Sequence, residues 1–574
     1  MTAARRPVGR TPLAVLSALA VLVAALLGAC AAIPTSGAVV VGVDKVSEPG
    51  PLSPLGERPA PGAGPVAIVQ GFLTASAAGF SRDPSADVNN DFSVAREYLA
   101  GEARGTWRPR ERVVVYPTSS IPEITLVSDT QVQVKLTVAA RIDANGQYAE
   151  AVPGAQESLV FDLVEDSSGQ WRISVLDDGV VLSAPSFEQV YRSAAIYFLS
   201  PDSSYLVPDV RWFPVRNLAT SVMQALLAGP SAWLRDGVRT AVPEGVKLTP
   251  DAVPIAADGT AEVGLSGAAL AALAERALLL AQIEATLRIP RVSGVDVTAG
   301  GVPLTTTPTV LKRGIDSEAP LEALQGDVLT TLSKGALVPV DGVGSLAGLA
   351  AHDAARDEAG TVRVLLSGAD SLVLAPTADA PAKVLLRAPG LVPPSVDRLG
   401  WAWTAHAGAG GSLDAVRADG QVVAVGADWL AGRTVRSLRV SRDGTRIAVL
   451  SSGADGLTLD VAAVMRDDKE RPQQLGAALG VGSTLVDATR VVWVDDSTLG
   501  VLGRSGAATA AAYHLVPLAG QTRALPTLDG AVTIAGGKGE RALYAATSDG
   551  QLFWRSGQSW VVAATGARDP SLPG

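Results

Sequence analysis

The feature that most constrains the fold of this chain is a series of Asp-Gly turns between short β-rich runs near its C-terminal end. Asp419–Gly420, Asp443–Gly444 and Asp549–Gly550 each separate two runs rich in β-branched and other apolar residues. Four such units begin near residues 397, 435, 488 and 531. Their spacing of roughly 40–50 residues is the repeat length of a propeller blade.

Residues 330–574 are therefore predicted to form an all-β C-terminal propeller. At this repeat length they hold about five or six blades. A jelly roll or a β-sandwich is the alternative, but neither of these folds has a recurring unit.

The start of the chain has the three parts of an export signal. Arg5 and Arg6 provide a positive segment, an apolar run covers 13–27, and the small residues Gly28 and Ala29 follow. The apolar run is shorter than the ~20 residues that a membrane-spanning helix needs. We therefore predict that residues 1–29 are a cleaved signal peptide.

Cys30 is the only cysteine in the chain, so it has no partner for an internal disulfide. It directly follows Leu27, Gly28 and Ala29, and this segment resembles the bacterial lipobox. The resemblance implies that the Cys30 thiol receives a diacylglycerol and that the peptide is cut before it. A diacyl group supplies the two chains that stable anchoring takes. The expected location is the extracytoplasmic face of the cell membrane, with fatty acyl groups such as palmitate at Cys30.

The charge balance argues against nucleic acid as a partner. The net charge is −10 and no long run of lysine or arginine occurs, whereas sequence-independent nucleic-acid binding needs a basic surface. The chain is 47% hydrophobic and 18% charged, which is typical of a globular protein.

The part before residue 190 divides into a tether and a first domain. Residues 30–64 are rich in proline and glycine, as in a semi-extended linker. Residues 65–185 show helical spacing first and period-two alternation later, with a hairpin signal at Asn145–Gly146. We predict an α+β N-terminal domain of the NTF2-like type, with helices preceding one curved antiparallel sheet. Trp107 and Trp171 are its predicted core anchors.

Residues 190–310 are predicted to form a second α+β domain. Helical patterns cover 217–227, with Gly229 as a stop signal, and 268–287. The segment resembles the GerMN domain, a binding module of extracytoplasmic bacterial proteins. The resemblance is carried, in order, by Tyr197-Phe198, Leu206-Val207-Pro208, Ala228-Gly229-Pro230, Val242-Pro243-Glu244-Gly245, Gly259-Thr260-Ala261, Gln282-Ile283 and Thr286-Leu287.

Residue patterns that support catalysis are scarce. The sequence has three histidines, and it has no HExxH, CxxC, nucleophile-elbow or P-loop motif. Adjacent aspartates occur at 467–468 and 495–496, but neighbours on a strand point to opposite faces. We interpret these aspartates as turn residues, with a surface calcium site as the alternative. The histidines His352, His406 and His514 are interpreted as structural, and we expect no enzyme activity, no catalytic residue, no metal and no cofactor beyond the lipid.

The order of segments resembles the LpqB family of actinobacterial lipoproteins, as does the stretch from Cys30 to Gly37. This resemblance implies an accessory regulator of a two-component system of the MtrAB type. Its expected partner is the extracellular domain of an MtrB-like sensor histidine kinase, in signalling on the cell envelope and division. Two alternatives stay open: a scaffold lipoprotein that binds peptidoglycan without a kinase partner, and an envelope hydrolase with acid/base groups at a propeller mouth.

Overall fold

The computed structural model describes Thr2 and seven stretches of the chain, which are residues 56–80, 92–267, 275–307, 309–314, 318–408, 410–506 and 508–573. Apart from Thr2, the predicted signal peptide lies outside these residues, as do the predicted lipobox with Cys30 and residues 30–55 of the predicted tether, so lipidation stays a prediction. No helix in the described stretches is long and apolar enough to span a bilayer. All elements below belong to one compact unit, Ser53–Gly574.

The N-terminal region opens with three helices, which are α2 (Pro65–Ala78), α3 (Ser93–Arg96) and α4 (Ala103–Thr106). A proline in the first turn suits the start of α2, because that N–H has no helical acceptor. Ile68, Val69 and Phe72 form its buried side. The Phe72 ring meets the ring of Trp107 edge to face, 5.1 Å apart. Trp107 is 2% exposed and is a core anchor as predicted, whereas Trp171 packs on the same cluster from a half-buried position.

The strands that follow form two four-stranded sheets, β2–β3–β6–β7 and β5–β4–β1–β8. Their bounds are β1 (Arg112–Tyr116), β2 (Glu123–Ser128), β3 (Gln131–Thr137), β4 (Ala140–Asp143), β5 (Tyr148–Glu150), β6 (Gln156–Glu165), β7 (Trp171–Val175) and β8 (Val180–Ser183). The region is thus α+β as predicted, and Asn145–Gly146 lies in the β4–β5 turn. The strands do not form one antiparallel sheet, because β1 runs parallel to β8 with Val114 opposite Val181. Alternation fixes the inward face of a strand but not its partner. The NTF2-like form stays a prediction.

The second region is built on a long hairpin. Its elements are α5 (Ala184–Val190), β9 (Tyr191–Leu199), β10 (Tyr205–Pro214), α6 (Leu218–Ala228), the 3-10 turn η3 (Arg235–Gly237), β11 (Thr260–Leu265), α7 (Arg276–Thr286), β12 (Gly294–Ala299), β13 (Val302–Pro303) and β14 (Lys312–Arg313). Gly229 ends α6 as predicted, with a φ of 92° that suits glycine. Of the predicted helix 268–287, residues 268–274 lie outside the described part.

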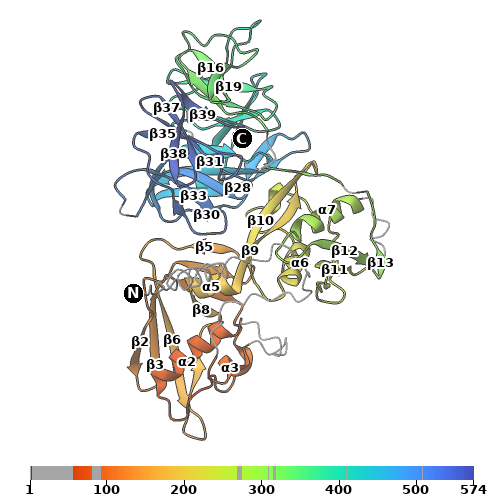
Figure 1. Cartoon of the computed structure of the whole chain (residues 1–574), viewed down its shortest axis with the longest axis vertical. Helices are drawn as coiled ribbons and strands as arrows, with labels where there is room; N and C mark the ends of the chain where they lie inside the picture. Colours follow the sequence, from red (N-terminus) through yellow and green to blue (C-terminus); the bar gives the residue numbers. More distant parts are fainter. Residues whose placement is uncertain are drawn as a thin grey trace. The chain divides into compact units, whose positions relative to one another are not determined.

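The C-terminal region consists of six sheets, each with a core of four antiparallel strands, in the described residues 322–571 (Figure 1, green to blue). Neighbouring innermost strands contact one another in a closed ring. In ring order they are β39 (Arg568–Ser571), β18 (Ala351–Arg356), β22 (Ser395–Val396), β26 (Thr434–Val440), β31 (Leu485–Trp493) and β35 (Ala531–Ala535). This arrangement is a six-bladed propeller.

The outer strands complete the blades. They are β15 (Glu322–Gln325), β16 (Val328–Ser333), β17 (Ala336–Pro339), β19 (Arg363–Ser367), β20 (Ser371–Leu374), β21 (Lys383–Arg387), β23 (Trp401–Thr404), β24 (Leu413–Arg417), β25 (Val422–Val425), β27 (Arg446–Gly453), β28 (Gly456–Arg466), β29 (Pro472–Leu475), β30 (Leu479–Val481), β32 (Thr498–Ser505), β33 (Ala512–Pro517), β34 (Arg523–Ala524), β36 (Tyr544–Thr547), β37 (Gln551–Ser556) and β38 (Ser559–Thr565), and a 3-10 turn η5 (Asp428–Leu430) follows β25. The last strand, β39, pairs with β15, so the two ends of the region share one blade and close the ring.

The Asp-Gly pairs occupy the predicted turns between strands. The Asp443 carboxylate accepts the backbone N–H of Thr445 at 2.9 Å, and that of Asp419 accepts the N–H of Gln421 at 2.8 Å. An aspartate that binds the backbone two residues on stabilises a tight turn locally. The repeated pair therefore marks blade turns, as the sequence indicated.

Candidate functional site

The three histidines have structural partners, and they do not come together. His406 Nδ1 lies 2.7 Å from Asp414, and His514 is buried against the carbonyl of Ala512. In the described stretches no group of three or more His, Cys, Asp or Glu side chains could hold a metal ion. The two pairs of adjacent aspartates make different contacts. Asp467 and Asp495 accept backbone N–H groups in turns, as predicted. Asp496 instead binds an arginine from another region.

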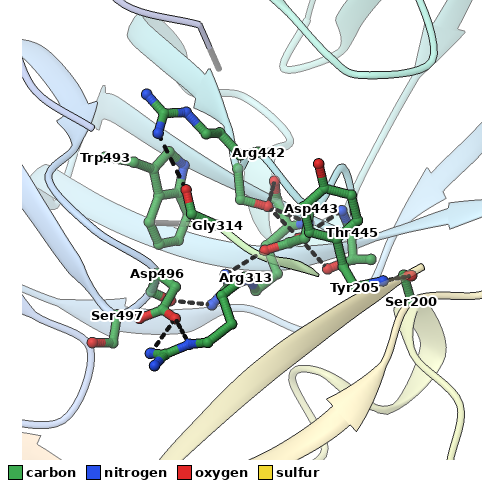
Figure 2. Close-up of polar contacts among 12 residues, drawn as sticks. Ser200, Tyr205, Arg313, Gly314, Arg442, Asp443, Thr445, Trp493, Asp496 and Ser497 are labelled. Carbon is green, nitrogen blue, oxygen red and sulfur yellow. Dashed lines mark hydrogen bonds and ion pairs between the residues drawn. The ribbon is translucent and has the colours of Figure 1, made fainter. Parts of the chain in front are cut away.

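That arginine is Arg313, at the end of the segment that leads into the propeller (Figure 2). Its Nη2 and Nε lie 2.7 and 3.1 Å from one carboxylate oxygen of Asp496. Its guanidinium also lies over the ring of Tyr197, 5.1 Å from the centroid. The next residue, Gly314, accepts a hydrogen bond from Arg442 at 3.2 Å. The segment is thus held against the propeller from both sides.

A buried ion pair of the propeller lies next to this contact and is hydrogen-bonded to Asp496. Asp443 and Arg446 bind each other with both side chains fully buried, and Arg446 Nη1 donates to the Asp496 carbonyl at 2.7 Å. Its guanidinium lies 4.9 Å from the ring of Trp493. Burial alone would raise the pKa of Asp443, but the charge of Arg446 and hydrogen bonds hold it below the usual value. Such a pair needs nearly complete hydrogen bonding to remain charged inside a protein.

Further contacts join the same regions. Arg398 of the propeller binds Asp202 of the β9–β10 turn through two nitrogens, at 2.8 and 2.9 Å. Trp212 Nε1 donates to the carbonyl of Ala519 at 2.9 Å. One hydrophobic cluster also extends from the second region into the propeller. It contains, among others, Leu226, Leu234, Ile283, Val461 and Val491.

The N-terminal region makes its own contact with the propeller. The Glu150 carboxylate accepts hydrogen bonds from the backbone N–H and the hydroxyl of Thr522, at 2.8 and 2.6 Å. Ser483 donates to the Glu150 carbonyl at 2.8 Å. Burial raises the pKa of Glu150, although the bonds from Thr522 oppose this shift. Each of the first two regions is therefore joined to the third by polar contacts.

A second polar cluster lies on the innermost propeller strands. Asp353 of β18 binds His352 at 2.9 Å and Arg490 at 3.3 Å, and its N–H donates to Asp569 of β39 at 3.3 Å. Both aspartates have left-handed backbones, with φ of 48° and 50°. The hydrogen bond that His352 donates to the Asp353 carboxylate raises the pKa of His352, whereas burial and the Asp353 charge raise the pKa of Asp569.

The hydrolase hypothesis predicts such a cluster, but its geometry does not suit general base catalysis. His352 Nδ1 faces the Asp353 carboxylate, and Nε2 faces the Gly368 carbonyl at 2.9 Å. Two acceptors favour a ring that is protonated on both nitrogens. A base must accept a proton from a nucleophile within hydrogen-bond reach. The cluster instead joins β18 to β39, the strand that closes the ring.

Cavities in the first two regions differ in size. One in the N-terminal region, between Phe72 and Asp178, has a volume of about 20 Å³, which is room for about one water. One in the second region has a volume of about 420 Å³ and is lined by Arg192 and Arg291 among others. No sequence pattern indicated this cavity, because its lining residues come from segments far apart in the chain.

Three family descriptions match consecutive parts of the chain. Residues 58–188 match "Lipoprotein LpqB, N-terminal domain", residues 195–305 match "Sporulation and spore germination", and residues 327–573 match "Lipoprotein LpqB beta-propeller domain".

Similar curated proteins cover nearly the whole chain. Lipoprotein LpqB of Thermobifida fusca is 30% identical over 89% of this chain and 90% of its own length. Lipoprotein LpqB of Streptomyces coelicolor is 28% identical over 96% of both chains. Among solved structures, a chain of a nidogen/laminin complex covers 44% of this chain and 94% of its own length, at 12% identity and a TM-score of 0.32. That structural likeness is too weak to carry a conclusion.

Proposed function

Because the chain belongs to the LpqB lipoprotein family, we propose that it is a lipid-anchored, extracytoplasmic accessory regulator of a sensor histidine kinase of the MtrAB type. In this proposal Cys30 carries the lipid, and the extracellular domain of an MtrB-like kinase is the partner. The function is binding rather than catalysis.

The observation that carries the proposal is the way in which the regions are joined. Arg313–Asp496, Arg398–Asp202 and Glu150–Thr522 connect the first two regions to the propeller. A binder changes a kinase equilibrium only through different affinities for its two states. A body whose regions hold fixed contacts loses little conformational entropy on binding, which favours such discrimination.

The lipid supports the same mechanism. An anchor at Cys30 confines the protein to the membrane surface that also holds the kinase. Confinement raises the effective concentration of each partner toward the other without a new contact. A modest affinity between the two proteins is then sufficient.

Co-purification from membranes tests the proposal. The full-length protein with a C-terminal tag is crosslinked in cells, extracted in detergent and captured, and the bound proteins and muropeptides are measured. We expect the sensor kinase to be recovered with the wild type. Cys30→Ala is the matched control, because it leaves every described contact in place, and it should recover the kinase at least about tenfold less.

The peptidoglycan-scaffold alternative predicts a different result in the same experiment. Recovery of muropeptides together with no enrichment of the kinase over a tagged unrelated lipoprotein would contradict the regulatory proposal. It would support the scaffold function.

A further inference from the structure

The 420 Å³ cavity lies within the second region, where several of its elements begin or end. Arg192 comes from the start of β9, and Leu218 from the first turn of α6. The loop that precedes β11 contributes Val253 and Ile255, and the segment after α7 contributes Arg291. The volume is within the range of small-molecule sites, ~300–1,000 Å³.

The charge of this cavity is opposite to that of the chain. The protein has a net charge of −10, yet the charged residues that line the cavity are Arg192 and Arg291, and none of its described lining residues carries a carboxylate. Arg192 Nη1 donates to the carbonyl of Tyr191 at 2.8 Å and also contacts that of Glu188. Backbone carbonyls orient the guanidinium without neutralising its charge. The cavity is therefore complementary to an anion.

The rest of the lining is apolar. Val253 and Ile289 are buried, while Ile255 also lines the cavity and is 38% exposed. A ligand that used this lining would place an apolar group beside its anionic group. The Asn217 side chain does not cap α6, so the positive end of the helix dipole adds to the potential at this wall.

We propose that this cavity binds a short peptide through its C-terminal carboxylate, with a small apolar side chain against Val253 and Ile255. A planar carboxylate matches the donor geometry of a guanidinium group. The apolar lining favours a carboxylate on an apolar body over free phosphate, which has no such body. This proposal goes beyond the kinase proposal, because it concerns a small ligand of one cavity and its test requires no kinase.

The test is a ligand-detected NMR titration of the full-length protein in detergent micelles at low ionic strength. The probes are N-acetyl-alanyl-alanine as the free acid, its C-terminal amide and inorganic phosphate. We expect the acid to bind at least about tenfold more tightly than the amide, a factor that corresponds to ~1.4 kcal/mol. The L,L and D,D forms of the acid distinguish a protein C-terminus from a cell-wall peptide as the source.

Substitutions locate the site. Arg291→Gln and Arg192→Gln should each weaken binding of the acid about tenfold and leave the weak binding of the amide unchanged. Ile255→Ser should weaken binding of the acid several-fold without changing the affinity for phosphate. Arg235→Gln is the matched control, since Arg235 is exposed in the same region and does not line the cavity. Unfolding temperatures of all variants check that the fold is retained.

Three outcomes would overturn the proposal. They are equal affinity for acid and amide, equal affinity for phosphate and acid, and unchanged affinity of both arginine variants. A loss of binding in Arg235→Gln equal to that in Arg291→Gln would also contradict it, because the effect would then be one of net charge.

Discussion

Arg313 and Asp496 lie 183 positions apart in the sequence and are joined by two hydrogen bonds, at 2.7 and 3.1 Å. Arg313 ends the short strand that pairs with β10, and Asp496 follows the innermost strand of a propeller blade. The pair therefore connects the β9–β10 hairpin with the ring of blades. Asp496 is 7% exposed, which makes the contact stronger than a surface ion pair.

We predict that Arg313→Gln loosens the pairing of β14 with β10 without unfolding the protein. Loss of a half-buried ion pair of this kind should lower the free energy of local opening by ~1–2 kcal/mol, which is a factor of about 5–30 in the opening equilibrium. Hydrogen exchange of residues 205–213 and 312–314 measures that opening, and it should accelerate by this factor. Exchange within β27 and β28 should stay unchanged, since their ladder does not depend on Arg313.

Arg523→Gln is the matched control for this experiment. Arg523 binds Glu540 at 3.0 Å, but their side chains are 53% and 46% exposed. An exposed pair contributes ~0–1 kcal/mol, so hydrogen exchange in β10 and β14 of this variant should equal that of the wild type. Equal exchange in Arg313→Gln and in the control would contradict the role assigned to Arg313.

The second prediction concerns Asp202 at low pH. Burial alone would raise the pKa of Asp202, but bonds from Ser200, Ser204 and Arg398 lower it to about 2. A carboxyl group whose pKa is lower when folded stabilises the fold above its unfolded pKa of ~3.9, and this contribution disappears as the pH falls toward 2. With a side chain 33% exposed, its contribution at neutral pH should be ~1 kcal/mol after solvent screening.

The measurement compares the wild type with Asp202→Asn by thermal unfolding between pH 7 and pH 2. The variant should be less stable at pH 7, and the difference should shrink below about pH 4. Asp419→Asn in an exposed turn serves as the control, and its difference from the wild type should stay small throughout. If Asp202→Asn were less stable than the wild type by the same amount at every pH down to 2, the negative charge of Asp202 would not be what stabilises the fold.

The propeller was predictable because its signal is local and repeated. Asp443 and Gly444 form a turn within a few residues, and their carboxylate and backbone bonds need no distant partner. Such a turn imposes the same short pattern on several blades, so spacing alone indicates the architecture. Within the described blades, Asp357, Asp397 and Asp495 at the ends of inner strands also accept N–H groups from the following turns. Asp495 is interpreted as a turn residue from the sequence, but the repeat that these three aspartates form was missed there.

The contacts between regions were not predictable, and the reason is physical. An arginine between two predicted domains, such as Arg313, looks the same in the sequence whether it faces water or Asp496, because its partner is set by how whole domains pack. The parallel pairing of β1 and β8 was not predictable for another reason. Both strands contain short continuous runs of buried apolar residues, 113–115 and 180–182, and such a run indicates a buried strand without showing which strand is its partner. The cavity with Arg192 and Arg291 also depends on segments that only the folded chain brings together.

The third prediction uses Asp569, whose pKa is raised by burial and by the nearby charge of Asp353. A raised carboxyl pKa means that the folded state binds a proton more tightly than the unfolded state. The ionised form therefore destabilises the fold at neutral pH, and stability recovers as the pH falls through the folded pKa toward ~3.9. Asp569→Asn removes the charge, keeps an oxygen acceptor for the Asp353 N–H and tolerates the left-handed backbone.

We expect Asp569→Asn to raise the stability at pH 7 by about 0.5–1 kcal/mol and to lose this advantage near pH 4. Thermal unfolding at both pH values measures it. Asp569→Ala is the matched comparison, because it removes the charge and also the acceptor, and it should not be stabilising. If Asp569→Asn were less stable than the wild type at pH 7, the carboxylate would be a favourable member of the cluster with Arg568 and Arg490.

The last prediction tests the anchor. Cys30 is the only cysteine, so Cys30→Ala removes the single site for a thioether lipid while leaving the described residues unchanged. In cells grown with a radiolabelled fatty acid, the wild type should carry the label and partition into the detergent phase. The variant should carry none and appear in the aqueous phase or the medium, because each lost acyl methylene removes ~0.8 kcal/mol of membrane affinity. Ala29→Ser, which keeps a small residue before the cut site, should remain labelled. Labelling of Cys30→Ala at the wild-type level would place the lipid elsewhere and remove the basis for confinement at the kinase surface.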